Sequence, residues 1–501
     1  MAQAAADDPG RQSLAPRMGP KAASAMLFMG MAQAGRLVLT VLSTVVVARI
    51  LSPGDYGLIA MVAPVTAFVM FFQDLGLNSA TIQAKSISAE QSNSLFWRNM
   101  LASVVIALAL VALSPAAAWF YADIRAGFLT AASALGVLLG GLALQHTALM
   151  TRDLRFGTIS AIEMSSAALG FAATVALALA WRNYWALFVG GLITIGMRTV
   201  LTWANSNWRP SRPNPGRDVR DMTRFGRDVM GFNLINFFVR NADNVLIAKV
   251  AGAGVLGLYD RSYRLMMFPI QTINQPINRL MLPVLSRLSG EPERYRRTFL
   301  LAASVVCWAA LPGIILATAL SDGLVVMLMG ERWAAAGPIF FWLGLTGVMQ
   351  TVPNLTGSLF MSTGNTRTMM AWSVFSAVVT LAGFGVGLIW GGVGVAASLF
   401  VTTTARTPVL FAICRKGTAI TPKDLYAVSA GPILGASVAA LAIRYGAQGW
   451  GTPLQLMIGL IAVYGSGSLV VLATAGGRDV ARRSLALMLA IRNRKRDLQA
   501  C

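Results

Sequence analysis

Apolar runs long enough to cross a lipid bilayer recur along nearly the whole chain of 501 residues, separated by short polar segments. The hydrocarbon core of a bilayer needs about 20 apolar residues per helical span, and about fourteen such runs fit this sequence. A composition that is 56% hydrophobic and only 12% charged agrees with that pattern. The sequence therefore predicts an all-α polytopic membrane protein, with no separate soluble domain.

The ends of the apolar runs give approximate bounds for each predicted span. The run that begins at residue 23 is too long for the hydrophobic part of a signal peptide, so we expect a retained first helix. The predicted spans are 23–48, 58–80, 93–113, 127–148, 158–180, 184–204, 228–248, 257–285, 298–320, 334–361, 369–390, 391–413, 425–442 and 453–474.

Basic residues are distributed unevenly between the two sets of connecting segments. If the N-terminus is cytoplasmic, the segments on that side hold 27 Lys and Arg, and the opposite loops hold six. The more basic loops of a membrane protein stay in the cytoplasm, so we expect both termini there. The formal net charge of +21 then favours contact with anionic lipid headgroups over binding to nucleic acid.

Residues that carry metal or nucleotide chemistry are sparse. The three cysteines, Cys307, Cys414 and Cys501, lie far apart, and the single histidine, His146, has no second ligand at metal-binding spacing. No GxxxxGK[ST] phosphate loop is present, which argues against ATP hydrolysis by this chain. We expect no catalytic residues, no metal site and no cofactor, and therefore a protein that is not an enzyme.

A short segment is repeated after 200 residues. VVARILSPGDYGL (46–58) aligns without a gap with LIAKVAGAGVLGL (246–258), and both copies end an apolar helix at a basic residue and turn through glycine. Six predicted spans separate the copies, and an even number gives both halves the same orientation in the membrane. This pattern predicts two parallel repeats related by an axis along the membrane normal, as in some transporters.

The repeat divides the chain into segments. The predicted segments are a cytoplasmic tail (1–22), a first six-helix lobe (23–204), a cytoplasmic linker (205–227), a second six-helix lobe (228–413), two further helices (425–474) and a basic cytoplasmic tail (475–501).

Eight arginines fall within the predicted spans, where a central charge costs about 2.5–3.5 kcal/mol on insertion scales. Arg36 and Arg240 lie in the middle of the first and seventh spans, which are equivalent under the repeat. The others lie nearer to span ends, where long side chains can reach water. Five of these are candidate secondary basic sites: Arg198, Arg261, Arg264, Arg279 and Arg406.

Polar residues accompany the two central arginines at helical spacing. A residue every three or four positions makes one polar stripe on a helix. The stripes consist of Gln33, Arg36, Thr40 and Ser43 in the first span and of Asn233, Asn236, Arg240, Asp243 and Asn244 in the seventh, and Asn274 in the eighth span adds a polar position. The pattern predicts an aqueous cavity between two lobes. A local Asp243–Arg240 salt bridge is the structural alternative.

Carboxylates inside the spans are few. Asp260 and Arg264 stand at i and i+4, which predicts a local ion pair, and Tyr259 and Tyr263 beside them fit an interfacial aromatic belt. Asp74 and Asp243 are candidates for groups that titrate during transport, although Asp74 also fits a solvated helix end.

Several phrases of the sequence resemble one protein family. ARILSPGDYGLIAMV, QDLGLNSATIQ, GLYDRSYRL and QPINRLMLPVLSRL are similar to segments of the Wzx-type polysaccharide-unit flippases of the MOP (multidrug/oligosaccharidyl-lipid/polysaccharide) superfamily. The resemblance covers nearly the whole chain and is strongest at 48–83 and 245–288. It implies a fold of two six-helix lobes with two additional C-terminal helices.

The resemblance also implies a substrate and a place of action. We expect an undecaprenyl-diphosphate-linked oligosaccharide to be flipped from the cytoplasmic to the periplasmic leaflet of a bacterial inner membrane, by alternating access, for exopolysaccharide or lipopolysaccharide synthesis. Arg36 and Arg240 would bind the diphosphate, because guanidinium groups contact phosphate oxygens in bidentate fashion. Membrane lipids and a polysaccharide polymerase or export complex are the other expected partners.

Other functions fit parts of the pattern. A flippase for peptidoglycan lipid precursors shares the expected charge, and a multidrug exporter of the same superfamily would be expected to carry central carboxylates. A membrane glycan ligase or polymerase would act on the same carrier lipid, but it would be expected to have a substantial periplasmic loop. A purely structural membrane partner leaves the duplicated polar positions unexplained.

Overall fold

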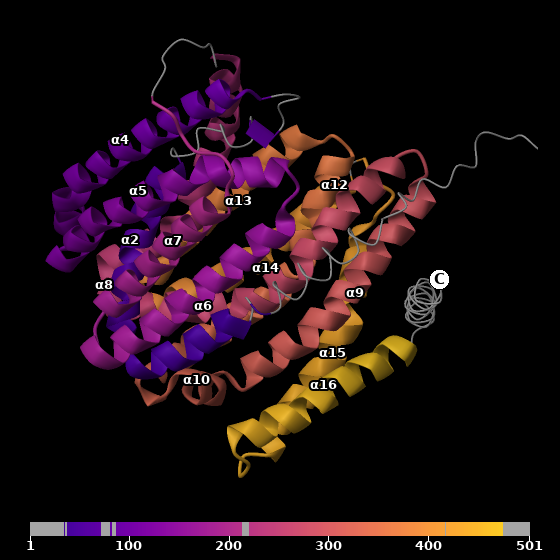
Figure 1. Ribbon diagram of the computed structural model, residues 1–501. Coiled ribbons are helices and arrows are strands. Elements are labelled where there is room, and N and C mark those ends of the chain that lie inside the picture. Colours follow the sequence, from indigo (N-terminus) through magenta and orange to yellow (C-terminus); the bar gives the residue numbers. More distant parts are fainter. Residues whose placement is uncertain are drawn as a thin grey trace, which may run out of the picture.

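A computed structural model provides the structure of the chain. It describes residues 35, 38–71, 81–82, 87–212, 220–415 and 417–473, and their side chains except at 68–71, 220–240, 279 and 471. The structure consists of long helices joined by short turns (Figure 1). They are α2 Pro53–Phe71, α4 Ala89–Tyr121, α5 Ile124–Arg152, α6 Phe156–Trp181, α7 Trp185–Asn205, α8 Arg220–Arg287, α9 Pro292–Ala319, α10 Ser321–Met329, η2 Glu331–Trp333, α11 Ala336–Gln350, η3 Pro353–Leu355, α12 Thr356–Ser362, α13 Thr366–Gly387, η4 Leu388–Trp390, α14 Gly391–Cys414, α15 Pro422–Gly446 and α16 Thr452–Ala473. A further apolar helix, Val38–Ile50, precedes α2.

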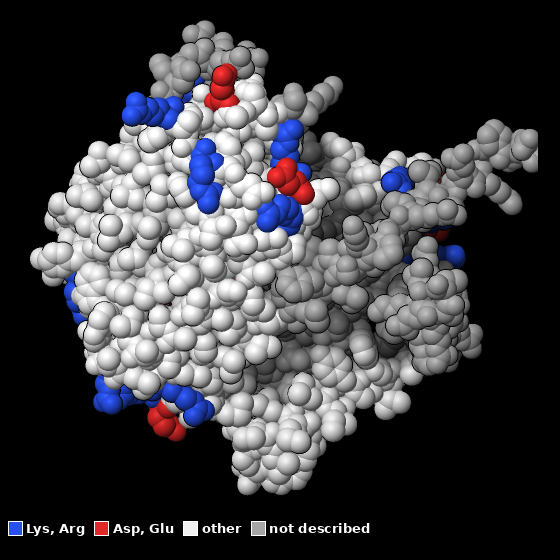
Figure 2. Space-filling model, in the orientation of Figure 1, with Lys and Arg blue, Asp and Glu red and all other residues white. Residues whose placement is uncertain are grey.

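The helices confirm a polytopic membrane protein. Among the described residues, nine helical segments are long and apolar enough to cross a bilayer, and two of these, Asn241–Arg287 and Thr366–Cys414, have roughly twice the length that one span needs. Figure 2 shows charged side chains gathered toward the two ends of the helices, with a broad uncharged area between them. This distribution matches a belt of lipid contact across the middle of the molecule.

Successive helices run back and forth, so their connections alternate between two ends of the bundle. We name the end with the turns at 51–52 and 252 the turn end, and the end where α7 runs into residues 206–212 the linker end. Large exposed aromatic side chains ring the turn end, as expected where helices leave the hydrocarbon. They are Trp119, Trp181, Trp390, Tyr445 and Trp450.

Two predicted spans differ from the structure. The span predicted at 334–361 is broken into α11, η3 and α12, because Pro353 has no N–H to donate to a carbonyl of the preceding turn. The short helix α10 was not predicted, since nine residues are too few to stand out as a span. The helix predicted at 93–113 is longer, since α4 continues through Pro115 to Tyr121.

The main core joins the two halves of the chain. It contains Leu51, Leu58 and Met61 from the first half, packed in the same cluster as side chains from α8, α9, α10, α11 and α14. A smaller core lies between α4 and α5. The last two helices, α15 and α16, pack on each other and on α9 at the outer edge of the bundle (Figure 1).

Candidate functional site

The second-half copy of the repeated segment is a tight hairpin within α8. Gly252 has φ 77° and ψ −179°, which is open to glycine and strained for other residues. The Tyr259 hydroxyl donates to Asp243 Oδ2 at 3.2 Å although sixteen residues separate them. A straight helix would hold these positions about 24 Å apart. The chain therefore doubles back at Gly252 and divides α8 into two antiparallel arms.

The first-half copy turns in a different way. Ser52 and Asp55 form reciprocal contacts, in which the Ser52 N–H donates to Asp55 Oδ2 at 3.0 Å and the Asp55 N–H donates to Ser52 Oγ at 3.3 Å. Pro53 occupies the first turn of α2, where its missing N–H is not needed. The sequence SPGD thus ends one helix and starts the next in four residues.

The two turns pack directly against each other through equivalent glycines. A Cβ atom at Gly57 would lie 1.7 Å from the Ala253 carbonyl oxygen, and one at Gly257 would lie 1.8 Å from the Pro53 carbonyl oxygen. Only glycine permits backbones this close. Contact between positions 200 residues apart is the arrangement expected near an axis that relates two repeats. The remainder of the two-lobe arrangement stays a prediction.

Equivalent basic residues of the repeat bind the helix ends of the opposite half. Arg49 Nη2 donates to the Met327 carbonyl at 2.5 Å, in the last turn of α10. Lys249 Nζ donates to the Phe120 carbonyl at 2.5 Å, in the last turn of α4. The last carbonyls of a helix have no partner within it and carry partial negative charge, so a cation is a favourable partner.

Aromatic side chains complete the closure of the turn end. The Trp333 indole N–H donates to the Ala48 carbonyl at 2.8 Å, and the ring meets the Tyr56 ring edge-on at a centroid distance of 5.4 Å. Trp333 is completely buried and Tyr56 is only 4% exposed. The first and second halves are therefore joined here by packing as well as by hydrogen bonds.

A cavity of about 440 Å³ lies directly beside these contacts. Its walls come from the helix Val38–Ile50, from both arms of α8 and from the end of α10. The polar residues on the wall include Thr40, Thr44, Asn244, Asp260, Arg261 and Arg264.

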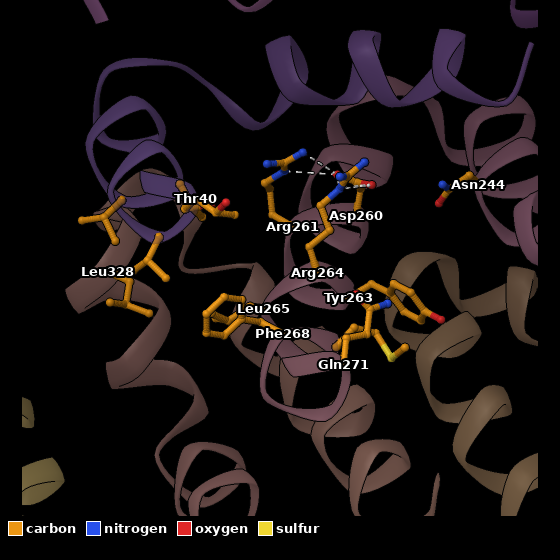
Figure 3. A pocket seen from close by; sticks show the side chains of 14 residues that line it. Thr40, Asn244, Asp260, Arg261, Tyr263, Arg264, Leu265, Phe268, Gln271 and Leu328 are labelled. Atoms are coloured by element: carbon orange, nitrogen blue, oxygen red, sulfur yellow. Dashed lines mark hydrogen bonds and ion pairs between the residues drawn. The ribbon is translucent and has the colours of Figure 1, made fainter. Parts of the chain in front are cut away.

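Two guanidinium groups share one carboxylate on the cavity wall. Arg261 Nη2 lies 2.8 Å from Asp260 Oδ2, and Arg264 Nε lies 3.0 Å from the same oxygen. The Arg261 side chain is 16% exposed, whereas that of Arg264 is 60% exposed. Figure 3 shows both groups converging on Asp260 at the edge of the cavity. Two cations and one anion leave this cluster with a net positive charge.

The ion pair predicted between Asp260 and Arg264 is confirmed. The aromatic belt predicted beside it is wrong for Tyr259, which is completely buried and stacks on Tyr263 at a centroid distance of 6.1 Å. Its hydroxyl instead satisfies Asp243, a buried carboxylate that would be costly without a partner.

The structure brings some of the predicted site residues together and separates others. Thr40, Asn244, Arg261 and Arg264 line the cavity. Three do not line it: Ser43 is half-buried, and Asp243 and Asn274 are buried, with neither amide atom of Asn274 bonded within the described residues.

Two predicted secondary arginines lie elsewhere. Arg198 on α7 is about half exposed, 4.0 Å from Glu163. Arg406 on α14 donates to hydroxyl groups of Ser376 and Thr380 on α13.

The remaining predicted residues cannot be placed at the site from the structure. Gln33, Arg36 and Asp74 lie outside the described residues. The positions 233, 236, 240 and 279 belong to α8, but their side chains are outside the described part, so Asn233, Asn236, Arg240 and Arg279 stay predictions.

Sequence reasoning missed the role of Tyr56. The centre of the Arg261 guanidinium lies 4.4 Å above the Tyr56 ring, close enough for a cation–π contact between the two halves of the chain. The two residues are 205 positions apart, and helical periodicity carries no information on such pairs. The position of Tyr56 one residue before the repeated Gly57 was the only available signal.

Several proteins with related sequences have names that refer to polysaccharide biosynthesis. The succinoglycan biosynthesis transport protein ExoT of Rhizobium meliloti is 26% identical over 466 residues, which cover 91% of this chain and 93% of the relative. An uncharacterized membrane protein in the cps region of Klebsiella pneumoniae is 26% identical, over 75% and 78% of the two chains. The lipopolysaccharide biosynthesis protein WzxC of Escherichia coli is 26% identical, over 72% and 74%.

Solved structures share the fold. The lipid II flippase MurJ in an inward closed conformation has a TM-score of 0.71 at 13% identity and covers 91% of this chain and 100% of its own. An inward-facing multidrug resistance MATE family transporter of the MOP superfamily has a TM-score of 0.59 at 12% identity, over 81% and 99%. Both matches show that this chain has the overall fold of those two transporters. The model of the polysaccharide biosynthesis protein family matches residues 46–338, more than half of the chain, and the chain belongs to that family.

Proposed function

We propose that this protein flips an undecaprenyl-diphosphate-linked oligosaccharide from the cytoplasmic to the periplasmic leaflet of the inner membrane, by alternating access through the cavity beside the paired turns. The linker end and both termini then face the cytoplasm, and the turn end faces the periplasm. The single observation that carries the proposal is the pair of guanidinium groups on one carboxylate inside the bundle.

The chemistry of the head group explains why such a cluster would stand there. A diphosphate must leave water to cross about 30 Å of hydrocarbon, while its polyprenyl tail can stay in lipid. Arginine replaces water around phosphate oxygens with two parallel hydrogen bonds. Hydroxyl and amide groups, such as those of Thr40 and Asn244 on the same wall, suit a sugar because they bond its hydroxyls without adding charge.

Two further arginines extend the proposed site toward the cytoplasm. Arg36 and Arg240 stand four positions before Thr40 and Asn244, the cavity residues of their helices. Side chains four apart share one helical face, so we infer that both arginines continue the polar walls. Asn233 and Asn236 would line the sugar path beyond them, and Asp74 and Asp243 are candidates for groups that titrate during transport.

The rival functions fit the cavity less well. A multidrug exporter for cations would be expected to present excess carboxylate, whereas the described wall has two arginines and one aspartate among its charged groups. A ligase or polymerase would be expected to carry a long loop at the turn end, and there the connection between α15 and α16 runs only from Ala447 to Gly451. A flippase for peptidoglycan precursors shares the same head group chemistry.

Translocation in proteoliposomes tests the proposal. Wild type and the variants Arg36→Ala, Arg240→Ala and Arg264→Ala would be reconstituted in equal amounts with a fluorescent polyprenyl-diphosphate oligosaccharide. We expect transport by wild type and loss in all three variants. Full transport activity in all three variants would contradict the proposed diphosphate site. Transport of a cationic dye but not the lipid by wild type would favour the exporter.

A further inference from the structure

Arg261 is the residue that belongs both to the cavity and to the closed turn end. Toward the cavity it donates to Asp260 from Nε at 3.1 Å and from Nη2 at 2.8 Å. Toward the closure its guanidinium lies over the ring of Tyr56, 4.4 Å from the centroid. Arg264 shares the carboxylate of Asp260, but its side chain is largely exposed to the cavity.

Tyr56 is a structural part of the closure. Its ring is held between the Arg261 guanidinium on one side and the Trp333 ring on another, and both of those residues come from the second half of the chain. The neighbouring residue, Gly57, makes the backbone contact with Ala253. A change in the position of Arg261 therefore removes one of the contacts that hold the two halves together at this end.

We propose that Arg261 couples binding of an anionic diphosphate head group in the cavity to opening of the turn end. The inference rests on the proposed function and concerns the regulation of the same site. In the empty cavity, Asp260 and the Tyr56 ring hold the Arg261 guanidinium at the closure. A diphosphate offers stronger, bidentate acceptors and draws the guanidinium into the cavity, so the contact with Tyr56 is lost.

The linkage between the two contacts sets the direction and size of the effect. A ligand shifts a conformational equilibrium only by its differential affinity for the two states. A cation–π contact changes such an equilibrium by roughly two- to thirtyfold, with the larger values for desolvated contacts. Because coupling is reciprocal, removing the Tyr56 ring frees Arg261 and is expected to tighten diphosphate binding several-fold. A merely structural Tyr56 would not affect affinity in this direction.

The distance across the turn end reports the opening. Ile124 at the start of α5 and Ile389 in η4 are exposed residues of the first and second halves at this end. Spin labels on Ile124→Cys and Ile389→Cys would be placed in a Cys501→Ser background, since Cys307 and Cys414 are buried. Full-length protein in nanodiscs would be measured by pulsed electron resonance with and without undecaprenyl diphosphate, and binding would be measured on the same samples.

Matched variants separate coupling from binding and from folding. Tyr56→Phe keeps the ring, and we expect it to open on ligand addition as wild type does. Tyr56→Leu removes the ring, and we expect a raised open population without ligand, little further change with it, and tighter binding. Arg49→Gln loosens the closure elsewhere, so we expect its open population to rise and still respond to ligand. Arg264→Lys weakens binding, but we expect it to open fully at saturation.

The possible outcomes distinguish failure of the coupling from failure of the proposed function. Opening that depends on ligand in wild type and Tyr56→Phe, but not in Tyr56→Leu, supports the coupling. Binding without any change in distance, or an unaltered response in Tyr56→Leu, overturns the coupling and leaves the proposed function standing. Absence of diphosphate binding in wild type overturns both.

Discussion

The two copies of the repeated segment agree in how they close the molecule and differ in what they offer to a ligand. Gly57 and Gly257 make the same kind of backbone contact, and Arg49 and Lys249 each bind a helix end of the opposite half. The duplicated chemistry is therefore that of a closure between two halves.

The charged residues beside the turn, in contrast, are not duplicated. Asp260, Arg261 and Arg264 face the cavity from the second half. The positions 200 residues earlier are Ala60, Met61 and Pro64, and the first two of these are buried in the core. Within the described residues, both copies keep the close glycine contact and the cation on a helix end of the other half, whereas the cluster of two arginines and one aspartate is present in the second copy only.

The largest expected effect comes from removing the charge that distinguishes the second copy. Hydrogen bonds to charged groups are each worth about 1.5–3 kcal/mol, so Arg261→Gln with Arg264→Gln should weaken undecaprenyl diphosphate binding by roughly 100-fold or more. Isothermal titration in detergent measures this. The matched control is Arg297→Gln, an exposed arginine at the start of α9. An unchanged dissociation constant in the double variant would contradict the account.

The next effect concerns the shared glycines. A methyl group at Gly57 or Gly257 would overlap a carbonyl of the facing turn. Overpacking of this kind costs about 1–3 kcal/mol, so Gly57→Ala and Gly257→Ala should lower the melting temperature and the yield of folded protein. The repeat supplies its own controls, because a methyl group at Gly54 would meet only Ser52 Oγ at 3.7 Å, and at Gly254 nothing within 4 Å. Equal melting temperatures for all four variants would show that the turns do not pack as described.

A smaller effect is expected at the equivalent cations. Arg49→Gln removes exposed hydrogen bonds to the carbonyls of Met327 and Leu328, and Lys249→Gln removes one to the carbonyl of Phe120, each bond worth about 1 kcal/mol. Either change should raise the rate of thiol modification at a cysteine placed in the turn-end contact by several-fold, and Lys249→Arg should restore the slow rate. An effect in only one of the two variants would show that the two equivalent cations do not contribute equally to the closure.

The smallest effect concerns the N-terminal cap of a helix, which is present in the first half at α5 and absent in the second half at α10. Asp123 caps α5 and pairs with Arg125, whereas Leu320, at the N-cap position of α10, provides no side-chain cap. The hydrogen bond from Arg125 holds the pKa of Asp123 below its usual value of 3.8. Its contribution is therefore present above the unfolded pKa and is lost as the pH falls through the lower folded pKa.

This sign can be checked by mutation and by pH. Asp123→Asn keeps the cap and removes the charge, and it should cost about 0.2–1 kcal/mol at pH 7. The difference in melting temperature from wild type should shrink as the pH falls below the usual Asp pKa of 3.8. A difference that grows as the pH falls would have the wrong sign for a carboxylate with a lowered pKa.

Most of the helices were predictable from the sequence because each apolar run is close to the thickness of a bilayer. The repeat was predictable too, since Gly57 and Gly257 stand in segments that align without a gap. The break at Pro353 and the short α10 were missed, because hydropathy averages over such lengths.

The cavity was predictable only in part. Thr40 and Asn244 follow from helical periodicity, which gives the face of a helix. Arg261 was expected to reach toward an interface, and the structure instead places it between Asp260 and Tyr56. That arrangement depends on which helix of the other half packs against α8, and local spacing contains no record of it.

The most direct test of the account is a structure of the protein with undecaprenyl diphosphate bound. We predict phosphate oxygens about 2.7–2.9 Å from the guanidinium nitrogens of both Arg261 and Arg264, with Arg261 withdrawn from the Tyr56 ring. A diphosphate bound elsewhere, for example at Arg406 or along α15 and α16, with the cluster at Asp260 unchanged, would contradict it.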